Sequence, residues 1–401
     1  MHPLVVDNFA GGGGASTETE RAAEQKDLFI TPRALDEIAT DPIIDEAAAA
    51  RAWFVFSLSG GKDCGAVSAL TMRYLDSIGH PRERRIAMHA DLGRAEWVST
   101  PAQVEAQARA LGLPLVVVRR GAGDLPTRFK GRWELGLAAY QDLRLYNLRG
   151  PFASPALKFC QSELKIQVMG PELARRFRGE MIVQITGLRR DESRARAATP
   201  VAKVDHRFAA AGNRAGTRML VWNPGVLLTA AEVFNINARY DIPLAESYGL
   251  GCSRHSCAFC IMASIHDLKC AASCAANAPL FHLYVGLEIT STFSFQAARW
   301  LGDIAPELLS AEERVGLERA KMLAEERRRL EAAMPAHHRY VAGWPLYVPT
   351  QDEAVAILDT RRVILGHHGV TSPYGSPELI IERFAGLRSA GEVRRSKKLA
   401  A

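Results

Sequence analysis

Short apolar runs that alternate with helical patterns between residues 53 and 186 constrain the fold more than any other feature. The runs have the length of buried strands and cover residues 53–58, 85–90, 115–118 and 181–186. Helical patterns cover residues 65–78, 101–111 and the region near 162–177. Buried strands separated by helices predict an α/β fold with a doubly wound parallel sheet, which places ligands at the carboxyl ends of its strands.

A glycine-rich loop follows the first predicted strand. Residues 59–64 read Ser-Gly-Gly-Lys-Asp-Cys and lead into a helical pattern. Two adjacent glycines let backbone N–H groups converge on an anion, and the following helix adds its positive N-terminal end. That dipole contributes about 1 kcal/mol, so Lys62 is needed as a direct charge partner, and Asp63 is placed to cap the helix or approach a metal ion. The pattern predicts a phosphate-binding loop without Walker spacing; a glycine turn that only caps a helix is the alternative.

The cysteines are unevenly distributed. Five of the seven lie between positions 252 and 274, and the chain shows no export signal, which favours metal or reactive-thiol roles over disulfides. Cys257 and Cys260 form a Cys-x-x-Cys pair, with Cys252 close by. Two thiolates at this spacing can clasp one metal centre, and a four-sulfur site suits either zinc or an iron–sulfur cluster.

Other candidate ligands have simpler explanations. Cys270 and Cys274 are four residues apart on an expected helix. We interpret them as small buried hydrophobic residues, and the alternative is that they substitute as metal ligands. The doublets His337-His338 and His367-His368 read first as surface histidines, with metal ligation as the alternative.

Four motifs in order along the chain resemble one family. Residues 59–63 (Ser-Gly-Gly-Lys-Asp) resemble the signature of ATP pyrophosphatases of the adenine-nucleotide alpha-hydrolase, or PP-loop, superfamily. The later motifs resemble those of the phosphoadenylylsulfate (PAPS) reductase family, which includes DNA phosphorothioation sulfurtransferases. They are His-Ala-Asp-Leu-Gly at 89–93, Phe-Cys-Gln-Ser-Glu-Leu-Lys-Ile at 159–166 and Thr-Gly-Leu-Arg-Arg-Asp-Glu-Ser at 186–193. The matches span about half of the chain.

The resemblance implies a nucleotide site. Its binding residues would be Ser59, Gly60, Gly61, Lys62, Asp63, Cys64, Asp91, Gly187 and Arg189. Its catalytic residues would be Lys62, Asp63, Arg189 and Glu192. Asp91 would stand near ATP or its Mg²⁺, and Arg189 and Glu192 would close over nucleotide and substrate. Without the resemblance, Arg189 and Glu192 could be a surface ion pair, which contributes little.

Cys64 departs from the family pattern, in which serine is usual. A thiol donates hydrogen bonds poorly, so it would weaken the grip on phosphate. We interpret Cys64 as a tolerated small residue. The alternative is a thiol whose pKa is lowered at the helix N-terminus and which reacts.

The resemblance also supplies a fourth metal ligand. Cys160 belongs to the Cys-x-x-x-Leu-Lys motif and would join Cys252, Cys257 and Cys260. The sulfurtransferase and reductase branches favour a 4Fe–4S cluster, with zinc as the alternative. Such a site would bind the nucleotide domain to the cysteine-rich segment.

The implied function is ATP cleavage between the α and β phosphates, which adenylates a substrate for sulfur transfer. DNA or RNA is the expected substrate, and a cysteine desulfurase or another sulfur donor is expected to supply the sulfur. A PAPS reductase acting on a sulfonucleotide is one alternative, although the Glu-Cys-Gly-Leu-His motif of that branch is absent from the sequence. A non-catalytic, nucleotide- and DNA-binding iron–sulfur subunit is the other.

Four regions are expected along the chain. They are an N-terminal extension (1–50), a PP-loop nucleotide-binding domain (51–240), a cysteine-rich segment (241–290) and a helical C-terminal region (291–401) that includes a long helix near 310–333. Between Gly187 and a helix expected near 229–239 the sequence turns polar, and we expect irregular structure there. Residues 5–16 resemble the cofactor-binding opening of DNA cytosine-5 methyltransferases, but the chain has no Pro-Cys dipeptide, so we interpret them as a stub.

The bulk properties set few further limits. The net charge of +6 and pI near 9.0 are compatible with nucleic-acid binding without being evidence for it. No apolar stretch reaches the roughly 20 residues of a membrane helix. We expect a soluble cytoplasmic protein without membrane partners.

Overall fold

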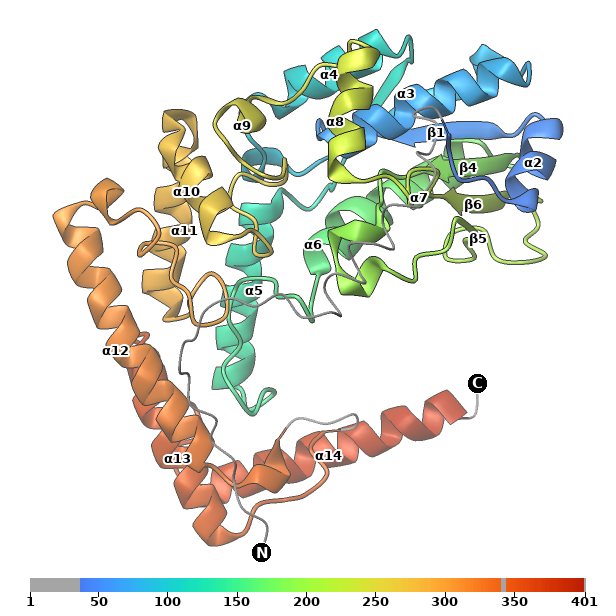
Figure 1. The fold of residues 1–401 in the computed structure, drawn as a ribbon. Helices are drawn as coiled ribbons and strands as arrows, with labels where there is room; N and C mark the ends of the chain where they lie inside the picture. The colour runs from blue at the N-terminus through green and yellow to red at the C-terminus, as the bar shows by residue number, and fades with distance from the viewer. Residues whose placement is uncertain (1–36, 340–343, 400–401) are drawn as a thin grey trace, which may run out of the picture. The chain divides into compact units, whose positions relative to one another are not determined.

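The computed structural model describes residues 37–339 and 344–399 of the 401-residue chain (Figure 1). The methyltransferase-like stretch lies outside the described residues. From Ala39 onward the described residues belong to one compact unit. The four regions expected along the chain stay a prediction.

A six-stranded sheet forms the centre of the nucleotide-binding half. Its strands are β1 Trp53–Ser57, β2 Arg85–Asp91, β3 Leu115–Arg119, β4 Met181–Ile185, β5 Ala202–Val204 and β6 Arg218–Trp222. Their order is β3-β2-β1-β4-β6-β5, and every neighbouring pair is parallel except β5 with β6. The predicted α/β class and parallel sheet are therefore confirmed.

The expectation of irregular structure after Gly187 is wrong, because this stretch adds β5 and β6. Residues 219–222 of β6 are all buried, and the Trp222 indole N–H donates to the Ala39 carbonyl at 2.8 Å. The three residues of β5 pair with β6 along the sheet edge. So short an edge strand carries too few residues for a strand pattern to show in the sequence.

Helices cover both faces of the sheet. Those of this half are α2 Pro42–Ala49, α3 Lys62–Ser77, α4 Thr100–Ala110, α6 Phe159–Gln161, α7 Gln167–Arg176 and α8 Ala230–Arg239. Figure 1 shows α3 and α8 side by side, and the two helices are in contact. Along β1, Val55 packs in a cluster with Leu173 of α7, whereas the Phe54 ring meets the ring of His80, which follows α3, at 4.8 Å.

The chain order defines where a ligand would enter. The chain runs outward through β1, β2 and β3, and then returns through α7 to β4 on the other side of β1. Right-handed crossovers place helices on opposite faces before and after this reversal. The switch point therefore lies between the carboxyl ends of β1 and β4, where sheets of this kind bind ligands.

A second hydrophobic core lies among helices. It joins α5 Leu125–Gln141, α10 Ile265–Ser273, α11 Ala278–Ser291 and α12 Ala311–Ala333 with part of the cysteine-rich segment. The Phe129 ring of α5 lies 5.6 Å from that of Tyr284, which in turn stacks on Phe295.

A smaller cluster joins the last two helices, α13 Gln351–Gly366 and α14 Pro377–Leu399, to Leu143 and Tyr146. The helical C-terminal region is thus confirmed. Among the described residues no single helix is long and apolar enough to cross a membrane; only the bent pair 265–273 and 275–291 meets the length and composition together.

Candidate functional site

The predicted phosphate loop lies between β1 and α3, at the switch point. Gly60 has a φ of +77°, a conformation that favours glycine, and Gly61 begins α3 without any side-chain cap. The N-terminal end of α3 is therefore not capped by a side chain of its own. Lys62, the first helical residue, is 3% exposed. Its ammonium lies 3.4 Å from the Asp63 carboxylate.

Gly187 brings the loop after β4 against this helix end. A Cβ at Gly187 would lie 2.8 Å from the Cys64 amide nitrogen, so only glycine permits this approach. The approach places the Arg189 guanidinium 2.6 Å from one Asp63 oxygen and 2.6 Å from Asp191. Arg189 is 5% exposed and pairs with Asp63 across the switch point, whereas Glu192 pairs with Arg196, so the alternative of a surface ion pair between Arg189 and Glu192 is wrong.

Further arginines gather beside this pair. Glu192 forms its ion pair with Arg196. The pKa of Arg196 is lowered, first by burial and then by the charge of Arg254, while the Asp63 carboxylate acts in the opposite direction. Arg189 contributes to the same lowering. Arg196 and Arg254 were missed by the sequence reasoning, since neither belongs to a motif and only the fold places Arg196 near Asp63 and Arg254 near Arg196.

The Cys64 thiol is buried beneath the loop. Its sulfur accepts a hydrogen bond from the Ser59 amide at 3.3 Å and donates to the Gly61 carbonyl at 3.0 Å. Burial raises the pKa of Cys64, with the Asp63 carboxylate adding to the effect. The thiol therefore links the backbones of Ser59 and Gly61 as a small structural residue, and the alternative of a lowered pKa is wrong.

Residues 247–255, which we call the cover segment, lie over the loop. The Tyr248 hydroxyl accepts hydrogen bonds from the amides of Lys62 at 3.0 Å and His255 at 3.3 Å. The Lys62 ammonium reaches the Ser253 carbonyl at 3.4 Å and faces the rings of Tyr248 and Phe234. Ser59 is exposed and Asp63 partly so, whereas the other four loop residues are buried.

The cover segment therefore already accepts the hydrogen bond of the Lys62 amide, which a bound phosphate would need as a donor. In most phosphate loops the amide at the start of the helix points at the anion. Here the Lys62 amide is already bonded to a phenol. An anion could accept a hydrogen bond from the Lys62 amide only in place of the Tyr248 hydroxyl.

Asp91, at the end of β2, is engaged elsewhere. It accepts a hydrogen bond from the Gly93 amide at 2.6 Å and pairs with Arg119 of β3 at 3.0 Å, which helps to lower the pKa of Asp91 against the effect of burial. It lines a cavity of about 490 Å³ together with Trp97 and Leu280. Residues 59–64 line neither this cavity nor the one of about 700 Å³ beside β3.

Three of the four predicted metal ligands come together. Burial raises the pKa of Cys160, and the nearby thiol of Cys260 raises it further. The pKa of Cys257 is raised by burial, then by Cys260, and also by Cys160. Lys165, of the same motif as Cys160, opposes the shift in both.

Cys252 lies with a different partner. Its pKa is raised by burial and then by a hydrogen bond with Cys270, whose sulfur also reaches the Leu250 carbonyl at 3.4 Å and the His266 ring at 3.7 Å. From the sequence, we interpreted Cys270 as a small buried hydrophobic residue, with metal ligation as the alternative. In the structure its thiol lies beside the thiol of Cys252.

The fold and the loop define a class: a doubly wound α/β protein with a glycine-rich, lysine-bearing loop at its switch point. Residues 53–263, more than half of the chain, match the family described as the phosphoadenosine phosphosulfate reductase domain. The protein belongs to this family, within the adenine-nucleotide alpha-hydrolase superfamily, and the predicted family membership is confirmed.

Comparison with individual proteins adds little. A crystal structure of phosphoadenylyl-sulfate (PAPS) reductase from Candida auris, in a phosphate complex, is 14% identical with a TM-score of 0.35. The match covers 61% of this chain and 97% of that one. No curated protein sequence matches the chain significantly.

Proposed function

We propose that the protein is an ATP pyrophosphatase that adenylates a substrate for sulfur transfer. The observation that carries the proposal is the complete Ser-Gly-Gly-Lys-Asp loop at the switch point, with Lys62 and the Asp63–Arg189 pair at its helix end. This concentration of donors and positive charge suits a β,γ-diphosphate leaving group. A sulfonucleotide has no such group.

The reaction has two displacements. A substrate oxygen attacks the α-phosphorus of ATP, the bond to the bridging oxygen of the β-phosphate breaks, and pyrophosphate leaves. A sulfur nucleophile then displaces AMP from the adenylated substrate. Mg²⁺, bound with ATP, would neutralise charge on the phosphates.

The chain's own residues have separate tasks in this proposal. The amides of Gly60 and Gly61 and the Lys62 ammonium would bind the departing pyrophosphate. Asp63 positions Arg189 through their 2.6 Å contact, and Arg189 would contact the α-phosphate. Glu192 holds Arg196, which would face the anionic substrate.

The cover segment must move for this to happen. A phosphate oxygen would replace the Tyr248 hydroxyl as the acceptor for the Lys62 amide, and the Lys62 ammonium would leave the Ser253 carbonyl. Both contacts are single hydrogen bonds, each contributing about 1 kcal/mol net, so nucleotide binding can offset their loss.

A 4Fe–4S cluster on Cys160, Cys257 and Cys260 fits the same proposal, with Cys252 or Cys270 completing the set. The preference for a cluster over zinc rests on the family to which the chain belongs. When bound, the cluster would supply redox or sulfur-transfer chemistry beside the nucleotide.

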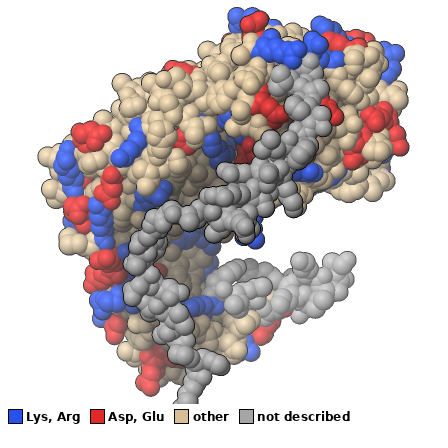
Figure 2. Space-filling model, in the orientation of Figure 1, with Lys and Arg blue, Asp and Glu red and all other residues tan. Residues whose placement is uncertain are grey.

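Nucleic acid is the acceptor that the local charges favour. On the face shown in Figure 2, Lys and Arg are interspersed with Asp and Glu. The acceptor would therefore rely on the arginines beside the loop, Arg196 and Arg254. A separate sulfur donor, such as a cysteine desulfurase, would complete the reaction.

The family match favours a second candidate, reduction of a sulfonucleotide. The two are separated by incubating anaerobically purified, iron-reconstituted protein with α-labelled ATP, DNA or RNA and sulfide as the sulfur nucleophile, and separately with PAPS and a dithiol reductant. We expect AMP and pyrophosphate from ATP, no sulfite from PAPS, and no AMP from the Lys62→Met variant. ADP as the product, or sulfite from PAPS, would overturn the proposal. Tight ATP binding without pyrophosphate release would indicate the non-catalytic alternative.

A further inference from the structure

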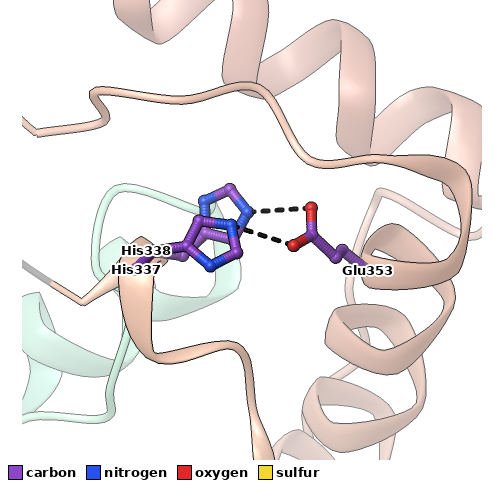
Figure 3. A group of neighbouring side chains, drawn as sticks. All are labelled: His337, His338 and Glu353. Atoms are coloured by element: carbon purple, nitrogen blue, oxygen red, sulfur yellow. Dashed lines mark hydrogen bonds and ion pairs between the residues drawn. The ribbon is translucent and has the colours of Figure 1, made fainter.

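The C-terminal region contains a cluster of potential metal ligands far along the chain from the phosphate loop. His337 and His338 lie on the short 3₁₀ turn Ala336–His338 that follows α12. Glu353 lies in the first turn of α13. In Figure 3 both imidazole rings face the same carboxylate. The Nε2 atom of His337 lies 2.9 Å from Glu353 Oε1, and that of His338 lies 3.3 Å from Oε2.

The donor atoms converge on one position. One ligand atom from each of His337, His338 and Glu353 lies within 4.8 Å of the other two, the only such trio of His, Cys, Asp or Glu among the described residues. The two ring centroids lie 4.3 Å apart, and both Nε2 atoms contact the Glu353 carboxylate.

The second histidine doublet offers a comparison. His367 pairs with Glu326 at 2.9 Å, whereas the His368 ring meets the Thr290 carbonyl at 3.2 Å. The two rings are 6.5 Å apart and share no carboxylate. A doublet alone does not produce the convergence seen at Glu353.

Surrounding contacts hold two of the three side chains in place. The Glu353 carboxylate also accepts the Thr350 amide at 2.9 Å in a capping box, which fixes its orientation. The His338 ring is buried between Phe384 and Tyr146. Its Nδ1 atom is buried without a hydrogen-bond partner, so the polar contacts of this ring depend on Nε2 alone.

We propose that His337, His338 and Glu353 bind a divalent transition-metal ion of the zinc class. Two imidazoles and one carboxylate are a ligand set typical of zinc, with a fourth position left for water. The His337 side chain is 51% exposed, which leaves that position open to solvent. The ion would tie the turn after α12 to the start of α13 and so stabilise the helical region.

Cobalt(II) tests the proposal, because it replaces zinc and reports its ligands by absorption. Tag-free, full-length protein, with its cysteine site already loaded, is titrated with Co²⁺ in the wild type and in His337→Gln and Glu353→Gln. Gln keeps the capping box at position 353, and His337 is exposed, so both variants should fold. His367→Gln is the matched control.

We expect the wild type and His367→Gln to bind one Co²⁺ per chain with ligand-field bands and no thiolate charge-transfer band. The two site variants should lose affinity by at least the 10- to 100-fold typical of altered metal surroundings. The proposal is overturned if all four proteins bind Co²⁺ with the same affinity, or if the only absorption change is a thiolate charge-transfer band. In either case the trio is an ion pair that binds no metal.

Discussion

At the residue scale, the surroundings of Cys64 decide whether it is a small structural residue or a reactive thiol. A helix N-terminus by itself lowers the pKa of a thiol. Here complete burial and the neighbouring Asp63 carboxylate outweigh that effect and raise the pKa. The thiol hydrogen bonds to Ser59 and Gly61 shape the loop, and a hydroxyl could make both.

We therefore expect Cys64→Ser to leave ATP affinity within roughly threefold of the wild type, since each hydrogen bond is replaced. In the native protein Cys64 should resist iodoacetamide at neutral pH until unfolding. Peptide mass spectrometry after timed alkylation measures this. Rapid labelling of Cys64, compared with the unfolded protein, would contradict the structural role.

Glu288 is the second residue whose surroundings decide its chemistry. Its carboxyl group accepts hydrogen bonds from the amides of Phe295 and Leu301, both at 2.7 Å, and of Gly302 at 3.2 Å. These bonds favour the ionised form. Burial has the larger effect and raises the pKa from 4.5 to about 8.

This shift gives stability a pH dependence of known sign. Between pH 4.5 and about 8 the folded protein keeps a proton that the unfolded chain has lost, so the contribution of Glu288 to stability falls as pH rises. Glu288→Gln removes this slope. Urea unfolding at several pH values should show the wild-type advantage over the variant shrinking across this window. Glu318→Gln, whose side chain is 69% exposed, is the control variant.

At the element scale, the cover segment is the feature that the sequence did not reveal. The strand, loop and first helix follow from local patterns: an apolar run, two glycines and helical spacing. The position of residues 247–255 over that loop depends on contacts almost 190 residues apart in sequence, such as Tyr248 with Lys62. Local patterns carry no information about such a pairing.

The same limit applies to the cysteines. The Cys-x-x-Cys spacing and the motif around Cys160 predicted three thiols that the structure brings near one another. Spacing could not show that Cys252 lies beside Cys270, because the turn between them decides which way the sulfur points.

Tyr248→Phe tests whether the cover segment opposes nucleotide binding. The change removes the acceptor for the amides of Lys62 and His255 but keeps the ring that faces the ammonium. ATP affinity should increase about fivefold, corresponding to one hydrogen bond of about 1 kcal/mol. Equilibrium binding of a fluorescent ATP analogue measures it.

Tyr374→Phe is the matched control, since its hydroxyl bonds to Asp142 in the C-terminal region. It should leave ATP affinity unchanged. Weaker binding in Tyr248→Phe would mean that the hydroxyl contacts the nucleotide directly.

At the scale of the whole molecule, α5 connects the sheet region to the C-terminal helices. Arg361 of α13 is 1% exposed, and its guanidinium donates to the carbonyls of Tyr140, Leu145 and Tyr146 around the end of α5. It also lies 3.9 Å from the Tyr140 ring centroid. The sequence placed helices in this region but could not place them against α5, because a buried arginine looks like any surface arginine in the sequence.

Arg361→Met should therefore destabilise the entire unit. Methionine fills much of the space, yet three buried carbonyls lose their donor, which we expect to cost about 3 kcal/mol in urea unfolding. The neighbouring Arg362 is 67% exposed and pairs with Asp359 at 3.5 Å, so Arg362→Met should cost well under 1 kcal/mol. If the two variants lose the same stability, the contact between α13 and α5 does not hold the parts together. Hydrogen exchange gives a second measurement. We expect Arg361→Met to accelerate exchange both in residues 140–148 and in α13, because the shared contacts make these two regions unfold as one cooperative unit.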